Sequence, residues 1–168
     1  MDNGLAKTQL ISKGLIIIFM IGAIIFSVAY MGQRWSKIRD IRRQGDAQAI
    51  IKALDYYYSQ YGVYPDITDD DGDGWDRSND TKEGGANFLE PLVVAGYLTA
   101  IPFDPRNDQL YYYQYKKFEA GEYACEKPFY VFQVVRFETD EIKHGYGSCP
   151  NLDWTKIAPQ GFTAMALE

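Results

Sequence analysis

Two consecutive hydrophobic patterns organise the first third of the chain. Residues 15–31, LIIIFMIGAIIFSVAYM, form an unbroken apolar run with no charged side chain. In residues 38–62 the apolar side chains recur three or four positions apart, which predicts one face of a helix. We call this second segment the spine helix. Its predicted apolar face consists of Ala47, Ile50, Ile51, Leu54, Tyr58 and Tyr61.

Charged residues and stop signals define the opposite face and the end of the spine helix. The charged side chains that fall largely on the other face, where we expect solvent, are Arg43, Asp46, Lys52 and Asp55. Gly62 tolerates the left-handed backbone that ends many helices, and Pro65 cannot extend one. The spine helix is therefore expected to end at about Gly62.

The apolar run is long enough to cross a membrane, because a helix of this length spans about 26 Å. A cleaved signal peptide is the alternative, since Ser27-Val28-Ala29 resembles a cleavage site that would leave Tyr30 as the first residue. The helical pattern continues past this site, which favours a retained anchor.

This interpretation divides the chain into three parts. We predict a short cytoplasmic leader-like segment (1–14), a transmembrane helix (15–33) and an extracytoplasmic head (34–168) that includes the spine helix. The side chains expected to face the membrane or other copies of the helix are Leu15, Ile18, Phe19, Gly22, Ile25 and Phe26.

Two signals disagree about the side of the membrane on which the head lies. More Lys and Arg residues follow the apolar run than precede it, and the positive-inside rule would then keep the head in the cytoplasm. A cysteine pair and an aspartate-rich loop, described below, favour the outside. We give these more weight and expect a single-pass protein of the inner (cytoplasmic) membrane.

The remainder of the chain has the pattern of short strands and loops. A short helix is expected from Leu89 to about Gly96, and Pro102 and Pro105 then require extended backbone. Residues 111–118 and 129–137 have strand composition and predict an antiparallel hairpin that lies against the spine helix. The predicted fold class is therefore α+β, and residues 154–168 receive no assignment.

Cys125 and Cys149 are the two cysteines of the chain. An even pair in an exported domain most simply forms a disulfide, although two free thiols in the core are the alternative. In the chain-entropy account, closing a loop of this size stabilises the fold by roughly 3 kcal/mol.

An aspartate-rich loop after the spine helix has the ligand spacing of a calcium loop. Alternating carboxylates precede Gly74, which permits the sharp turn, and a further carboxylate stands at the twelfth position. So many close carboxylates repel one another unless a cation lies among them, whereas the alternative is a solvated loop. The predicted Ca²⁺ ligands are Asp69, Asp71, Asp73, the backbone carbonyl of Trp75, and Asp80.

Charge and residue types argue against two other classes of protein. The formal net charge of −6 argues against nucleic acid as a partner, because phosphate binding needs a basic face. The basic cluster after the apolar run is expected to meet lipid headgroups, and consists of Arg34, Lys37, Arg39, Arg42 and Arg43. His144 is the only histidine, the cysteines are too far apart for a redox pair, and no phosphate-binding glycine motif occurs. We therefore predict that the protein is not an enzyme.

Several short motifs, in order along residues 13–115, resemble the type IV pilin-like proteins, and specifically the major pseudopilin of type II secretion systems. They are Lys13-Gly14, Ile38 to Arg43, Asp46-Ala47-Gln48, Tyr61 to Pro65, Gly96-Tyr97-Leu98, Ile101-Pro102, Asp104-Pro105 and Tyr111-Tyr112-Tyr113. The resemblance implies a long N-terminal helix that packs in a filament core and a small head that faces outward. The implied partners are further copies of this chain and other pilin-like or envelope proteins.

The chain also departs from that family. The family's peptidase site has Phe after the glycine and Glu at the fifth position, where this chain has Leu15 and Phe19. The family's calcium, where present, is held by a C-terminal loop rather than an early one. The missing Glu favours an alternative function, a membrane-anchored monomeric binding module on a pilin-like fold. The nearly continuous anchor and spine helix and the motifs of the head favour the function that we predict, a structural subunit of a type IV pilus-like or type II secretion pseudopilus-like filament with a calcium-stabilised head.

Overall fold

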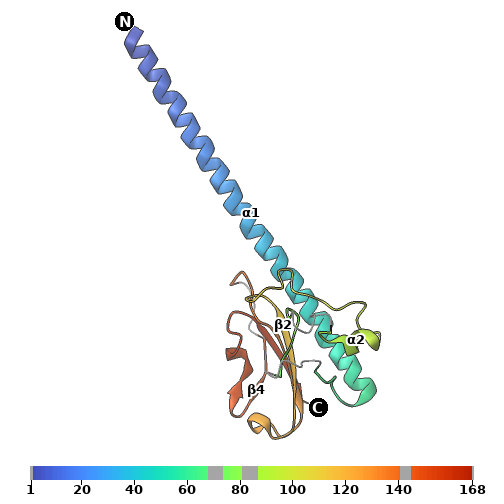
Figure 1. Ribbon diagram of the computed structural model, residues 1–168. Helices are drawn as coiled ribbons and strands as arrows, with labels where there is room; N and C mark the ends of the chain where they lie inside the picture. Colours follow the sequence, from blue (N-terminus) through green and yellow to red (C-terminus); the bar gives the residue numbers. More distant parts are fainter. Residues whose placement is uncertain (1, 68–73, 81–86, 141–144, 168) are drawn as a thin grey trace. The chain divides into compact units, whose positions relative to one another are not determined.

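The computed structural model describes residues 2–67, 74–80, 87–140 and 145–167, with side chains from Lys13 onward. The chain divides into two compact units, Met1–Ile38 and Arg39–Glu168. The described elements are, in order, α1 (Asp2–Tyr61), β1 (Asp76–Arg77), α2 (Glu90–Val94), β2 (Tyr113–Phe118), the 3-10 helix η1 (Glu122–Ala124), β3 (Phe129–Val134), β4 (Ser148–Cys149), β5 (Leu152–Asp153), the 3-10 helix η2 (Trp154–Lys156) and β6 (Phe162–Leu167) (Figure 1).

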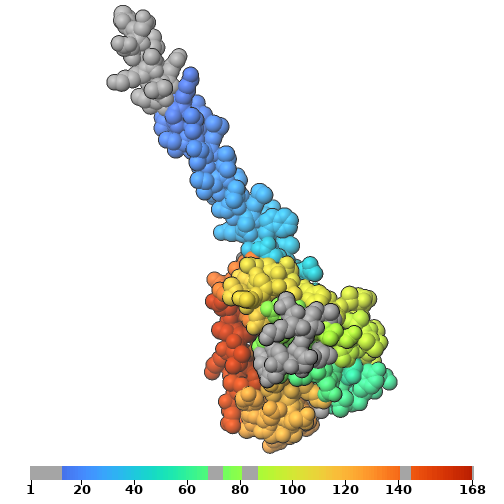
Figure 2. All heavy atoms as spheres, viewed as in Figure 1, coloured from blue at the N-terminus to red at the C-terminus, as the bar shows by residue number. Residues whose placement is uncertain are grey.

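The first unit is a stretch of α1 whose side chains are exposed from Lys13 to Trp35 (Figure 2). By length and composition, α1 contains one segment that is apolar enough to cross a membrane. The predicted helix over the apolar run is therefore confirmed. Large apolar side chains on all sides of a helix are typical of a segment that lies in lipid or among other helices.

The second unit, the head, combines the end of α1 with a four-stranded sheet of order β1-β2-β3-β6. All three strand pairings in this sheet are antiparallel, and β3 lies between β2 and β6 along its whole length. The hairpin of β2 and β3 confirms the predicted pairing, and the fold is α+β as predicted. A second sheet consists of the two-residue strands β4 and β5.

One face of the larger sheet packs on the last turns of α1. Tyr130, Phe132 and Val134 alternate along β3, so all three side chains point to this face. They are buried with Ile50 and Leu54 of α1, which confirms these positions of the predicted apolar face. Ala47 is buried as well, and Ile51 and Tyr58 are partly buried against the same core.

Two predictions for the faces of the spine helix are wrong. Tyr61, predicted to be buried, is 54% exposed, because it is the last residue of α1, where its ring contacts that of Tyr57 at a tilt. Arg43, predicted to face solvent, is fully buried. Lys52 and Asp55 are exposed as predicted, and Gly62 has the left-handed backbone expected of a helix stop (φ 72°).

The other face of the sheet carries a second, smaller core. Phe129 and Val131 of β3 point to it and are buried around Trp154. The predicted disulfide between Cys125 and Cys149 is present in this core, with the two Cα atoms 5.2 Å apart. Because β3 is buried on both faces, its sequence FYVFQV shows no alternation of apolar and polar residues.

Candidate functional site

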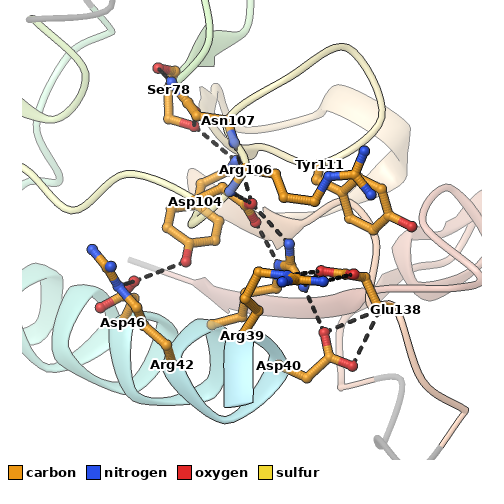
Figure 3. A network of polar contacts seen from close by, with 12 residues as sticks. Arg39, Asp40, Arg42, Asp46, Ser78, Asp104, Arg106, Asn107, Tyr111 and Glu138 are labelled. Atoms are coloured by element: carbon orange, nitrogen blue, oxygen red, sulfur yellow. Dashed lines mark hydrogen bonds and ion pairs between the residues drawn. The ribbon is translucent and has the colours of Figure 1, made fainter. Parts of the chain in front are cut away.

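A cluster of charged side chains lies inside the head, where α1 meets two loops (Figure 3). Its centre is Arg43, whose side chain is 0% exposed. The guanidinium group donates to both carboxylate oxygens of Asp104, from Nε at 2.6 Å and from Nη2 at 2.9 Å. Nη1 donates to Asp40 at 2.6 Å and to Glu138 at 2.9 Å. One arginine therefore contacts three carboxylates.

Asp40 fixes the loop that follows β3. Its carboxylate accepts hydrogen bonds from the backbone N–H groups of Glu138 and Thr139, at 3.0 Å and 2.8 Å. The Thr139 hydroxyl donates to the same carboxylate at 2.7 Å. Arg39 pairs with both carboxylate oxygens of Glu138. Hydrogen bonds to charged groups are the strong ones, so this corner of the head is held firmly.

Asp104 organises the loop before β2 in the same way. Its Oδ1 accepts hydrogen bonds from the backbone N–H groups of Arg106 at 2.8 Å and Asn107 at 3.3 Å. Asn107 has positive φ (44°), which asparagine tolerates better than most residues, and it exchanges two hydrogen bonds with Ser78. Asp104 therefore attaches the loop before β2 to Arg43, and hydrogen bonds within the loop hold Asp104 in place.

A second polar contact lies one turn along α1. The Tyr113 hydroxyl donates to Asp46 at 2.8 Å. Burial raises the pKa of the Asp46 carboxyl, although the hydrogen bond from Tyr113 and the charge of Arg42 oppose this shift. Burial, followed by the nearby Asp46 charge, also raises the pKa of Tyr113. Asp46 is thus only partly exposed, whereas the helical pattern predicted a solvent position.

The charge balance of the cluster explains how it can be buried. Burial alone lowers the pKa of the Arg43 guanidinium, but the contacts with Asp104, Glu138 and Asp40 more than reverse this, so the pKa is raised. Arg43 therefore stays charged, as an arginine side chain does in proteins. A buried charge without such partners would cost several kcal/mol. The cluster is a junction that binds α1 to the loops at Asp104 and Glu138.

The helical pattern missed this cluster, because hydropathy alone places an arginine on the solvent side. Two signals in the sequence were available. Asp40 and Arg43 stand three residues apart, which is a spacing that lets them pair on a helix. Asp104 lies between Pro102 and Pro105, in backbone that the prolines restrict.

The predicted calcium loop falls mostly on residues that the structure does not describe. Asp69, Asp71 and Asp73 lie outside the described residues, as does His144. Gly74 has the positive φ (77°) that the motif requires. Among the described residues, no three His, Cys, Asp or Glu side chains lie together as a metal site needs. The calcium site therefore stays a prediction.

The two described members of this loop flank β1. The indole ring of Trp75 packs in the second core, with its centroid 6.1 Å from that of Phe118 and 6.3 Å from that of Trp154. Asp80 follows β1 and is half-buried. The pairing of Asp76 and Arg77 with β2 thus fixes the end of the loop to the sheet.

The predicted membrane-facing residues are all in the first unit and all exposed. Gly22 is exposed, and the five residues with large side chains are each more than half exposed. These five are Leu15, Ile18, Phe19, Ile25 and Phe26. A Cβ atom built at Gly22 would meet no atom within 4 Å, so this position leaves a notch in the helix surface. Such a large apolar surface is typical of contact with lipid or with other protein chains.

Comparison of the chain with models of protein families, with curated proteins and with solved structures finds no match.

Proposed function

We propose that this protein is a structural subunit of a filament similar to a type IV pilus or a type II secretion pseudopilus. The observation that carries the proposal is α1 itself. One helix contains both the fully exposed apolar segment and the residues Ala47, Ile50 and Leu54 that form the core of the head. A subunit that packs through its anchor and displays its head needs these two segments to follow one another directly in the chain, as they do in α1.

The apolar segment needs a partner to cover it. In a membrane, lipid covers it, and helix association then depends on close packing rather than on the hydrophobic effect. Outside the membrane, only further apolar helices could cover it, since burying each large apolar side chain is worth about 1.5–3 kcal/mol. A filament of identical chains provides this cover on every side of the helix.

The head supports a location outside the cytoplasm. The Cys125–Cys149 disulfide suits an oxidising compartment, and disulfides are rare in the cytoplasm. The proposed localisation is a single pass through the inner membrane with the head outside, and the head is further stabilised by Ca²⁺ in the loop of residues 69–80. Neighbouring copies and other pilin-like or envelope proteins are the proposed partners.

A membrane-anchored monomer that displays the head to a ligand is the second candidate function. Leu15 and Phe19 favour it, because they stand where the pilin-like family has the residues used for processing and for assembly. In that case the apolar segment would contact lipid only, and its small residues would have no packing role.

Electron microscopy of material sheared from cells that express the protein distinguishes the two functions. We expect filaments that contain the chain, and the intact mass of the same fraction reports whether the segment before Leu15 is removed. Gly22→Leu is expected to reduce filaments strongly, because it fills the notch at Gly22 while leaving the segment apolar enough to insert.

Ile25→Leu is the matched control, since it conserves volume on the same helix and should leave filaments unchanged. Protein that remains entirely in the membrane, with none in the sheared fraction, would reject the filament. It would support the anchored monomer instead.

The calcium site has its own test, thermal unfolding with and without a chelator. At millimolar Ca²⁺ we expect the chelator to lower the midpoint by about 5 °C, from the affinities typical of extracellular calcium loops. The double variant Asp71→Ala, Asp73→Ala should show no chelator effect. The control Glu126→Ala, Asp140→Ala removes two exposed carboxylates elsewhere and should respond as the natural sequence does. An unchanged midpoint in the natural sequence would exclude the site.

A further inference from the structure

Three arginine side chains gather around the ring of Tyr111 in the head. The guanidinium carbon of Arg106 lies 4.2 Å from the ring centroid, that of Arg43 4.9 Å and that of Arg136 5.7 Å. Figure 3 shows Arg106 extended beside this ring. Cation–π contact explains why one ring attracts arginine, but three like charges at one ring also repel one another. The arrangement therefore needs anions.

The strand register places Arg136 beside Tyr111. In the pairing of β2 with β3, Tyr113 lies opposite Val134. The ladder continues beyond both strands, because the N–H of Val135 donates to the carbonyl of Tyr112 at 3.1 Å. Continued by one step, the same register pairs Tyr111 with Arg136, which agrees with the 5.7 Å between this guanidinium carbon and the ring centroid.

The loop before β2 places Arg106 on the same ring. Asp104 accepts the backbone N–H of Arg106, and Asp108 accepts the backbone N–H groups of Leu110 and Tyr111. This network of aspartate side chains and backbone fixes the turn between Arg106 and Tyr111 without any further partner. The two arginines thus reach one ring from separate, rigid segments.

The three arginines differ in how many carboxylate groups of the head they contact. Arg43 contacts three carboxylates, and Arg106 pairs with Asp108 at 2.9 Å. Among the residues that the structure describes, no carboxylate pairs with Arg136. Arg106 has a side chain that is 41% exposed, and Arg136 is half-buried, so solvent reaches both.

We propose that Arg106 and Arg136, at the ring of Tyr111, form a binding site for a phosphate-type oxyanion. Their guanidinium carbons lie 4.2 Å and 5.7 Å from the centroid of this ring, so both cations are held at the same place on the head. Each planar guanidinium fork matches two oxygens of a tetrahedral anion, which is why arginine is the common residue for phosphate recognition. The anion supplies the counter-charge that Arg136 lacks.

Two sources could provide this chemistry. A phospholipid headgroup is one, because the chain contains a segment that can cross a membrane. Free phosphate is the other. The site does not depend on filament assembly, so it is tested on unassembled full-length protein.

The experiment measures the shift in the thermal unfolding midpoint that inorganic phosphate causes, relative to chloride at equal ionic strength, in detergent. With a dissociation constant on the order of 1 mM, 50 mM phosphate should raise the midpoint of the natural sequence by about 5 °C. Arg136→Gln and Arg106→Gln should lose most of this shift. Arg136→Lys should lose much of it as well, because lysine keeps the charge but not the fork.

Lys127→Gln is the matched control, because it removes one exposed positive charge at the other end of β3 and should keep the full shift. Each variant is compared with itself, so a change in its own stability does not affect the result. An equal phosphate shift in all variants would mean a general salt effect and would reject the site.

Nanodiscs that contain phosphatidylglycerol or phosphatidylcholine, each measured in chloride and in phosphate at equal ionic strength, identify the source. In chloride, a higher midpoint in phosphatidylglycerol than in phosphatidylcholine, lost in Arg136→Gln, assigns the site to a lipid headgroup. A phosphate shift that persists unchanged in both lipids assigns it to free phosphate.

Discussion

Arg43→Gln is expected to lower the free energy of unfolding of the head by about 3–5 kcal/mol, the cost typical of breaking a buried ion pair from one side. Glutamine cannot reach Asp104 with two parallel hydrogen bonds and carries no charge. The substitution leaves the carboxylates of Asp104, Asp40 and Glu138 close together without a central cation. Denaturant unfolding, followed by circular dichroism, measures the loss.

Arg42→Gln is the control for this prediction, since it makes the same substitution one residue earlier. The Arg42 side chain is 61% exposed and its contact with Asp46 is 3.7 Å long, so we expect a change of less than about 1 kcal/mol. Equal effects of the two substitutions would show that the buried cluster contributes no more than a surface ion pair does.

Replacing the disulfide by Cys125→Ser, Cys149→Ser is expected to cost about 3 kcal/mol. The bond closes a loop with a sequence separation of 24, and without it the unfolded chain regains that freedom. The bond also lies in the second core, so two serine hydroxyls would be buried among Phe129 and Trp154. The measurement is the shift in the denaturant midpoint relative to the natural sequence.

Reduction of the natural sequence with dithiothreitol is the control for the serine substitutions. It opens the same loop without adding hydroxyl groups, so the difference between the two experiments reports the cost of burying serine. A reduced protein as stable as the oxidised one would mean that the loop is already constrained in the unfolded chain.

Helical periodicity predicted the packing of α1 where packing is apolar. Ile50 and Leu54 are buried, and Gly62 ends the helix, because these outcomes depend on local sequence and one repeating angle. The burial of Arg43 could not be predicted in this way. Its partner Asp104 is 61 residues away and Glu138 is 95 residues away, so only the folded chain brings the charges together.

The same limit applies to the strands. The hairpin of β2 and β3 was predicted because both segments are rich in aromatic and β-branched residues. β6 was missed, since FTAMAL contains two alanines and a methionine, which are weak strand formers. Its strand conformation follows from pairing with β3, which supplies the backbone partners. The arginine side chains around Tyr111 were missed for a related reason, since the folded hairpin brings Arg136 to this ring.

The position of β3 has a consequence for how the head is made. β3 precedes β6 in the chain, so it is synthesised first. Until β6 pairs with it, one backbone edge of its sequence FYVFQV is unpaired. Segments of this composition, with no charge and no proline, are prone to join the strands of other molecules. The protein is therefore prone to aggregate between the synthesis of β3 and its pairing with β6. A chaperone that shields this strand would shorten that exposure, and variants that weaken β6 would lengthen it.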